Sequence, residues 1–413
     1  MSHLYPADLL LPDPKRVDLS RYAVIACDQF TSEPAYWQAT EETVGEAPSA
    51  LRMILPELFL SERESRVPAI HAAMRAYSRD LLVKHPASVV YLRRECGEGG
   101  AVREGLVLAI DLLDYDFSKG TVSPIRPTEG TVTDRIPPRL EVRRGAPLEL
   151  PHVMLLVERG EEIFAPCRAM ADTSHPLYDI PLMQGGGRAV GYLLGEAEWA
   201  SVDAALSAHE ARATEQNPTS PLLYAVGDGN HSLATAKAHF LELRERLGEA
   251  ALTHPARYAL VELCALDSPA LVFHPIYRAV FGADPEALLS ALAEDASESR
   301  GFGRQTLTVL LPSGETRELV YPSGRHPLTV GTLQQFLDGY TAEHPEITVD
   351  YIHGEDSLAS IVRESGAVGF LFDGMSKDEL FPAVSASGAL PRKTFSMGEA
   401  TEKRYYLEAR EIV

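Results

Sequence analysis

The chain has 413 residues, with 38 Lys and Arg against 59 Asp and Glu, and a net charge of −21. This length predicts two or three domains and permits a core of substantial size. Hydrophobic residues make up 45% and charged residues 23%, which excludes a largely disordered chain. The acidic balance argues against a nucleic-acid partner, because such binding needs clustered Lys and Arg. A few local basic residues can still bind a small anion.

The cysteines and the N-terminus indicate the cellular compartment. Cys27, Cys96, Cys167 and Cys264 form no CxxC pair, so a zinc ribbon is unsupported and free cytoplasmic thiols are expected. The first residues lack the basic region of a secretion signal, and no apolar run approaches the roughly 18–20 residues of a membrane span. We therefore expect a cytoplasmic protein with no membrane partner and no zinc, haem or flavin.

The first two thirds of the chain alternate between strand and helix patterns. A buried strand at 22–26 leads into a polar loop at 27–32, and 61–84 has helical spacing. Glycines at 97–100 and 184–187 predict turns. Further strands are expected at 89–93, 105–112, 152–158, 189–194, 222–226 and 258–266, and helices at 197–216 and 232–247, while 122–144 is a polar, basic stretch.

The remaining chain repeats this mixture on a smaller scale. Helices are predicted at 285–293, 332–342 and 355–362, and strands at 307–311, 316–321, 348–352 and 367–372. Hairpins interspersed with helices favour an α+β, or mixed α/β, fold over a doubly wound sheet. We expect a main region at 1–284 and a C-terminal region at 285–413.

The most informative segment is Gly227-Asp228-Gly229-Asn230-His231-Ser232, between a buried strand and an Ala-rich helix. Glycines permit close backbone approach, and a helix N-terminus favours an anion. Asp228 could hold Mg²⁺ or orient a hydroxyl, and His231 could donate to a phosphate or move a proton. An ordinary connection in which Asp228 or Ser232 caps the helix explains the pattern equally well.

This segment resembles the DGHHR-type motif of a bacterial and archaeal family of unknown function, numbered 1015. The family is related to the ParB/sulfiredoxin superfamily, which includes nucleotide-dependent free serine kinases. The segments 22–30, 128–131, 274–278 and 391–394 are also similar to the family. The resemblance implies a ParB/sulfiredoxin-like nucleotide-binding core with family-specific α/β additions, and nucleotide phosphates at Gly227, Gly229, Asn230 and Ser232.

Two residues depart from that motif. Asn230 and Ser232 replace its His and Arg, so the bidentate phosphate clamp that Arg provides is missing. Lys237 lies too far along the helix to replace it. The departure weakens the inference of phosphate binding.

A second candidate site begins at Glu129. Four arginines follow within a short stretch, and with them Glu129 could act as a general base beside an anionic substrate. Alternatively, the stretch is a solvated hairpin whose arginines pair with the surplus acids. The four arginines are Arg135, Arg139, Arg143 and Arg144.

Three further segments have both a functional and a structural interpretation. The resemblance places His274 and Arg278 near the nucleotide, although a His in such a position is more often structural than catalytic. Arg392 and Lys393 could close over a phosphate or form a plain basic turn. Asp28 ends a strand, where functional residues often lie, but an Asp-based turn accounts for it too.

The resemblance and the candidate residues lead to one functional hypothesis. It is phosphotransfer between ATP or ADP, with Mg²⁺ on Asp228, and the hydroxyl of a small metabolite, with serine or phosphoserine the first candidate. The alternative is a non-catalytic regulatory protein that binds a nucleotide or metabolite. A ParB-like DNA-binding role is disfavoured by the charge and by the lack of a helix-turn-helix pattern.

Overall fold

The structure is a computed structural model that describes residues 2–96 and 100–413. Its mixed α/β fold confirms the predicted class. Two compact units are present: the first contains Met1–Pro127, Thr131–Leu271 and Glu399–Val413, and the second contains Thr128–Gly130 and Val272–Gly398. Of the turn expected at 97–100, residues 97–99 lie outside the described part of the chain.

The two units divide the chain differently from the expected boundary after residue 284. Strand β14 (Phe273–Phe281) belongs to the second unit because it pairs with β17 (Thr348–His353) and β18 (Val368–Leu371). The last residues return to the first unit through two short strand pairs. The composition of the chain cannot reveal these strand pairings, because each of them joins segments that lie far apart in the sequence.

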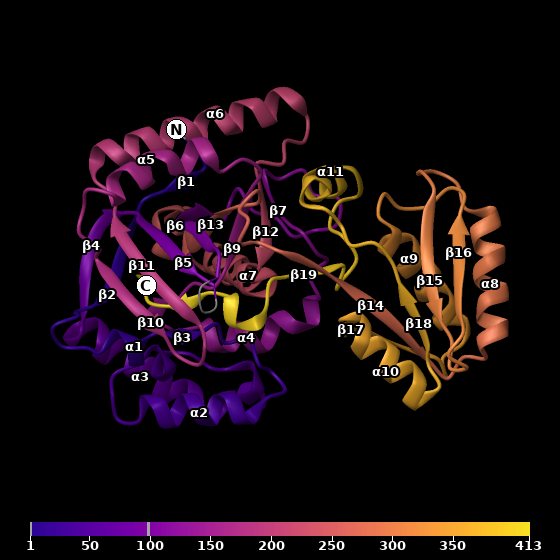
Figure 1. The fold of residues 1–413 in the computed structure, drawn as a ribbon. Helices are drawn as coiled ribbons and strands as arrows, with labels where there is room; N and C mark the ends of the chain where they lie inside the picture. The colour runs from indigo at the N-terminus through magenta and orange to yellow at the C-terminus, as the bar shows by residue number, and fades with distance from the viewer. Residues whose placement is uncertain (1, 97–99) are drawn as a thin grey trace. The chain divides into compact units, whose positions relative to one another are not determined.

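The first unit is built on a large mixed sheet (Figure 1). In this sheet β12 is parallel to β7 and antiparallel to β9, and β13 is parallel to β9. Its strand order is β10 (Tyr178–Leu182), β11 (Gly187–Leu193), β5 (Val90–Glu95), β6 (Val102–Asp111), β13 (Tyr258–Ala265), β9 (Met154–Val157), β12 (Tyr224–Asp228) and β7 (Ile125–Pro127), with β1 (Leu4–Tyr5) beside β6.

Both faces of this sheet are covered. On β6, Leu106 and Leu108 contribute to one hydrophobic core, and the alternating Val107 and Ala109 contribute to another. Burial on both faces explains why β6 is continuously apolar from Leu106 to Ile110. Helices α5 (Glu161–Ala171) and α6 (Glu196–Gln216), side by side in Figure 1, contribute to the first core. The second core includes residues of α1 (Leu19–Tyr22), α2 (Pro34–Val44), α3 (Arg63–Asp80) and the C-terminal segment 405–412.

Short strand pairs complete the first unit. They bring the N-terminal and C-terminal parts of the chain together, because β3 pairs with β20 in an antiparallel arrangement. The pairs are β2 (Ala7–Pro12) with β4 (Leu82–Ser88), β3 (Val24–Ile25) with β20 (Tyr405–Tyr406), and β8 (Leu148–Glu149) with β21 (Arg410–Glu411); helices α4 (Ile136–Arg143) and α7 (Asn230–Leu247) also belong to this unit.

The second unit has its own sheet, with helices packed against it. The predicted hairpin is confirmed as the antiparallel pair β15 and β16. Gln305 lies opposite Tyr321 at one end of this pair, and Leu310 lies opposite Thr316 at the other. The strand order is β16 (Thr316–Tyr321), β15 (Gln305–Leu310), β18, β14 and β17, with β19 (Phe395–Met397) on β14; the helices are α8 (Pro285–Glu298), α9 (Thr329–Glu343), α10 (Glu355–Ser365) and α11 (Lys377–Ser387).

Two predicted segments differ from the structure. The helix expected at 61–84 ends at Asp80, and the residues after it form β4, which pairs with β2. The polar stretch 122–144 is not a hairpin but strand β7 followed by helix α4, whose buried Ile136 and Leu140 face the core. No helix within residues 2–96 and 100–413 is both long and apolar enough to cross a membrane.

Candidate functional site

The turn between β12 and α7 opens directly onto a helix N-terminus. Gly229 has a φ of +78° and occupies the N-cap position without any side-chain cap. The alternative in which Asp228 or Ser232 caps the helix is therefore wrong. An added Cβ at Gly229 would lie 3.0 Å from Val153 Cα and 3.3 Å from His152 Cδ2, so only glycine fits. The uncapped first-turn N–H groups suit an anion.

Two carboxylates, a lysine and a histidine gather beside this turn. Lys403 Nζ lies 3.6 Å from Asp228 Oδ1, and His152 Nε2 lies 3.5 Å from Asp28 Oδ2. The phenol of Tyr406 lies 2.8 Å from His152 Nδ1 and so orients the imidazole. Lys403 and His152 are buried, whereas both carboxylates keep partial access to solvent. This arrangement is called the aspartate site below.

The two carboxylates differ in acidity. Burial raises the pKa of Asp228, and the nearby negative charge of Asp28 adds to this, against the attraction of Lys403. Burial also acts to raise the pKa of Asp28, but His152, the hydrogen bond from Gln29 and the charge of Lys403 outweigh it, so this pKa is lowered. Paired carboxylates whose pKa values are pushed apart are typical of acid–base sites.

Several buried polar atoms around the turn have no partner within the described residues. They are Asp228 Oδ2, Asn230 Oδ1 and Thr131 Oγ1. Thr131 is close to the turn because the N–H of its neighbour Val132 donates to His231 Nε2 at 3.3 Å. Buried polar groups in native proteins are nearly always hydrogen-bonded, so this group of atoms indicates a place for a polar ligand.

His231 is neutral at physiological pH. Burial, and then the positive charges of Arg139 and Arg135, lower its pKa to about 4. Its Nε2 accepts the Val132 N–H, so the ring proton is assigned to Nδ1. His231 can thus donate a hydrogen bond to a phosphate, but its low pKa suits it poorly to carrying a proton near pH 7.

Most arginines of the 135–144 stretch are paired with acids, as the structural alternative predicted. Arg139 donates to Glu57 with an Nε–Oε1 distance of 2.7 Å, and Arg143 lies 2.6 Å from Glu149. Arg144 pairs with Glu242 on α7. Arg135 is exposed, and its guanidinium has no partner among the residues that the structure describes. Of these arginines, Arg135 is therefore the candidate for an anionic ligand.

Glu129 lies in the second unit, on the short segment Thr128–Gly130, and forms an isolated parallel β-bridge with Leu390. Its Oε1 accepts the N–H of Thr394 at 3.3 Å. Burial raises the pKa of Glu129, against the backbone N–H groups of Lys393 and Thr394 and the charge of Lys393. Lys393 has a φ of +59°, a conformation that non-glycine residues adopt only where surrounding contacts hold it. A carboxylate with a raised pKa suits a general base.

Arg278 provides those contacts rather than a phosphate clamp. Its fully buried guanidinium donates to Gln334 Oε1 at 2.8 Å, and to the carbonyls of Ile276 at 2.6 Å and Lys393 at 3.1 Å. It also lies 4.5 Å from the ring centroid of Tyr351. The expectation that Arg278 binds nucleotide is thus replaced by a structural role, because its donors are already used within the protein.

The other predicted residues of the second unit are more open. Arg392 and Lys393 are exposed, and Arg392 Nε donates to the Tyr351 hydroxyl at 3.0 Å. His274 is half-buried on β14, opposite Ser396 of β19. These positions leave Arg392 and Lys393 able to meet an anionic ligand.

Sequence reasoning missed His152 and Lys403. The sequence pattern places His152 only at the start of a predicted strand, and Lys403 belongs to a C-terminal segment with no recognisable motif. The pairing of β3 with β20 brings Lys403 to the turn, and nothing near residue 403 in the sequence signals that pairing. Asp28 was detectable, because polar residues at a strand end often act in binding.

No group of three or more His, Cys, Asp or Glu side chains in the described ranges is arranged to hold a metal ion. Asp28 and Asp228 offer two carboxylates, one with an unpartnered oxygen. Mg²⁺ typically binds one or two carboxylates and completes its shell with phosphate oxygens and water. The aspartate site therefore fits Mg²⁺ only when it arrives with a phosphorylated ligand.

Comparison with solved structures found distant neighbours. A free serine kinase in complex with AMP is 12% identical, covers 76% of this chain and 92% of its own, and has a TM-score of 0.40. A variant of a free serine kinase in complex with ADP is 13% identical, with coverages of 73% and 91% and a TM-score of 0.39. A conserved hypothetical protein from Pyrococcus furiosus is 12% identical, with coverages of 73% and 90% and a TM-score of 0.35. No curated protein matches the chain.

The sequence also matches the model of a protein family. The match covers residues 5–340, and so includes Asp28, His152 and the β12–α7 turn. Lys403 and the 391–394 segment lie beyond it. Because the matched stretch is well over half of the chain, this protein belongs to the family described as "Protein of unknown function (DUF1015)".

Proposed function

We propose that the protein transfers a phosphoryl group between a nucleotide and the hydroxyl of a small metabolite, with serine or phosphoserine as the first candidate. The observation that carries this proposal is the aspartate site. An uncapped helix N-terminus, two carboxylates of opposite pKa shift and a buried lysine meet there. Phosphoryl transfer needs mainly positioning and neutralisation of charge, and these groups can supply both.

Each part of the aspartate site has a task in this proposal. The N–H groups at the start of α7 and the Nδ1–H of His231 hold phosphate oxygens. The carboxylates of Asp28 and Asp228 would hold Mg²⁺ together with those oxygens, and the ion would supply neutralisation of the developing charge. The ParB/sulfiredoxin-like relationship of this core is part of the same proposal.

Lys403 supports phosphate binding where the motif lacks its arginine. Ser232 cannot supply a positive charge, and the Lys237 ammonium is occupied by the carbonyl of Leu112 at 2.7 Å. Lys403 instead places an ammonium beside Asp228. A lysine acts as a point charge rather than a bidentate clamp, so it compensates for the charge of the missing arginine but not for its geometry.

The first experiment is a thermal-shift screen of ADP, ATP, CTP and GTP with Mg²⁺, with and without serine or phosphoserine. We expect one nucleotide to raise the melting temperature, and more so with one of the amino acids, because a ligand that binds only the folded state stabilises it. The free serine kinases found by comparison were solved with ADP or AMP, so adenine nucleotides are tested first.

Variants make that experiment specific to the aspartate site. Lys403→Met should remove most of the nucleotide-dependent shift, whereas Lys119→Met, at an exposed position, should leave it intact. A shift without consumption of the nucleotide would favour the alternative of a non-catalytic regulator. The absence of any shift would contradict both functions.

Glu129 is proposed as the general base. Glu129→Gln should lower turnover by about 100- to 10,000-fold, the range for loss of a general base, while the nucleotide-dependent thermal shift persists. In the wild type the rate should fall as the pH drops through the pKa of Glu129, because a base must be ionised, and that midpoint should lie above the ordinary 4.5. Steady-state rates across pH measure both effects.

The matched control is Glu315→Gln. Glu315 is exposed at the turn between β15 and β16, and among the described residues its carboxylate pairs only with neighbouring Arg317 on the surface. It should keep full activity. Undiminished turnover in Glu129→Gln would remove Glu129 from the reaction without affecting the proposal for the aspartate site.

A further inference from the structure

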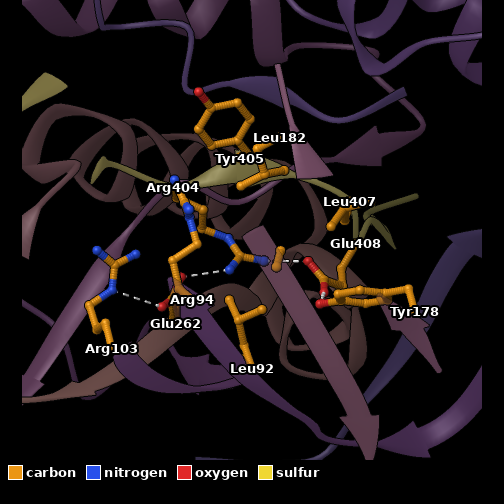
Figure 2. Close-up of a pocket in the computed structure, with 11 residues that line it drawn as sticks. Leu92, Arg94, Arg103, Tyr178, Leu182, Glu262, Arg404, Tyr405, Leu407 and Glu408 are labelled. Carbon is orange, nitrogen blue, oxygen red and sulfur yellow. Dashed lines mark hydrogen bonds and ion pairs between the residues drawn. The ribbon is translucent and has the colours of Figure 1, made fainter. Parts of the chain in front are cut away.

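A cluster of three arginines is buried inside the first unit, away from solvent (Figure 2). Arg94 lies on β5, Arg103 lies on β6, and Arg404 lies just before β20. Each is only 2% exposed. Figure 2 shows Glu262 between Arg103 and Arg404, with Arg94 nearby and Glu408 on the far side of Arg404. We call this group the arginine cluster.

Arg404 is fully paired, but the other two arginines are not. Arg404 donates to Glu262 at 2.7 Å, to Glu408, and to the carbonyl of Pro151 at 3.0 Å. In contrast, no described residue accepts a hydrogen bond from Arg94 Nε, Arg103 Nε or Arg103 Nη2. Arg103 Nε lies 3.5 Å from Glu262 Oε1, an ion-pair distance without hydrogen-bond geometry.

The charges in the arginine cluster do not balance. Three guanidiniums face two carboxylates, Glu262 and Glu408, so the described side chains sum to 3 − 2 = +1. Burial, and then repulsion from Arg103, lower the pKa of Arg94 to about 10. An unpaired buried charge is costly, and buried charges are almost always matched by a counter-charge.

A small cavity lies among these groups. It offers about 10 Å³ of space for the centre of a water-sized particle, and its lining combines the cluster with apolar side chains such as Leu92 and Leu407. A single water needs about 10–15 Å³ of such space, so a phosphate or sulfate is too large. The cavity can therefore take only a water molecule or a monatomic ion.

We propose that the arginine cluster binds a single monatomic anion, chloride under ordinary conditions. Such an ion accepts hydrogen bonds from the unpartnered N–H groups of Arg94 and Arg103 and neutralises the excess positive charge. A water molecule could accept from only two of the three donors and would leave the charge unbalanced. The three orphaned donors and the excess charge favour an anion, and the size of the cavity excludes a polyatomic one.

The anion would also support the aspartate site. Arg94 Nη2 donates to the carbonyl of Thr401 at 2.9 Å, and Arg103 Nη1 donates to that of Glu402 at 2.6 Å. These carbonyls directly precede Lys403, whose ammonium lies beside Asp228. Neutralising the charges of Arg94 and Arg103 would stabilise the position of residues 401–402, and with them the position of Lys403 beside Asp228.

The test uses the full chain in sodium salts of chloride, bromide or gluconate at equal ionic strength. We expect the melting temperature to rise with chloride and with bromide and then to saturate, and to change little with gluconate, which is too large for the cavity. Crystals grown in bromide should show an anomalous peak between Arg94 and Arg103. This readout does not depend on whether the protein binds a nucleotide.

Paired variants separate a specific ion from a general salt effect. Arg94→Met removes one positive charge and should abolish the chloride-dependent shift, whereas Arg93→Met, at the exposed neighbouring position on β5, should preserve it. Equal melting temperatures of the wild type in chloride and gluconate would overturn the proposal, as would a water without bromide signal in the cavity. Should Arg94→Met fail to fold, the bromide measurement on the wild type decides.

Discussion

Replacing Asp228 with asparagine is expected to lower turnover by about 100-fold or more, because it removes a carboxylate that would hold Mg²⁺, and the ion contributes several kcal/mol of transition-state stabilisation. The substitution keeps the shape of the side chain but removes its charge beside Lys403 and Asp28. Burial already disfavours that charge, as the raised pKa of Asp228 shows. The folded protein should therefore be as stable as the wild type or more so, which is typical of a functional site.

The measurement combines steady-state kinetics with thermal unfolding of the same preparation. Asp179→Asn is the matched control, because Asp179 is exposed on β10 and pairs with Arg188 at the surface. It should retain both activity and stability. If Asp228→Asn lost stability in parallel with activity, Asp228 would be a structural residue and the aspartate site would lose its proposed role.

The largest effect on stability is expected from Arg404→Met. Arg404 is the ion-pair partner of Glu408, whose side chain is 1% exposed, and it also pairs with Glu262. Breaking a buried ion pair by removing one partner typically costs about 3–5 kcal/mol, because the remaining charge stays buried. The substitution should lower the free energy of unfolding by that amount, measured by urea denaturation of the full chain.

A surface arginine provides the comparison for this variant. Arg79 pairs with Asp80 at 2.6 Å, but its side chain is 72% exposed. Exposed pairs contribute little to stability because water screens them, so Arg79→Met should leave the unfolding free energy nearly unchanged. Similar losses in the two variants would show that burial of the Arg404 pairs carries no special cost.

The environments of three arginines that the sequence suggests as anion ligands show why residue type alone identifies a site poorly. Arg139, Arg278 and Arg392 all looked like anion ligands, yet Arg139 is paired with Glu57 and Arg278 supports the 391–394 turn. Arg392 alone of these three keeps an exposed guanidinium. A guanidinium binds whatever acceptors the fold places around it, and those acceptors come from distant parts of the chain.

The local features of the site could be predicted from the sequence. The turn at 227–232, its two glycines and the helix after it were all predictable, because hydrophobic period and backbone freedom are properties of neighbouring residues. The same holds for the hairpin of β15 and β16 and for helix α6. Family membership was also indicated by these short motifs and agrees with the match over residues 5–340.

The side chains that surround that turn come from distant parts of the chain and depend on the tertiary fold. The backbone N–H of Cys27 meets the hydroxyl of Tyr406 across 379 residues of sequence, and the same strand pairing sets Lys403 beside Asp228. The tertiary fold also places β14 in the second unit, and it buries three arginines together with two glutamates in the first. Such pairings follow from burial and hydrogen bonding summed over the whole chain, so no local pattern in the sequence encodes them.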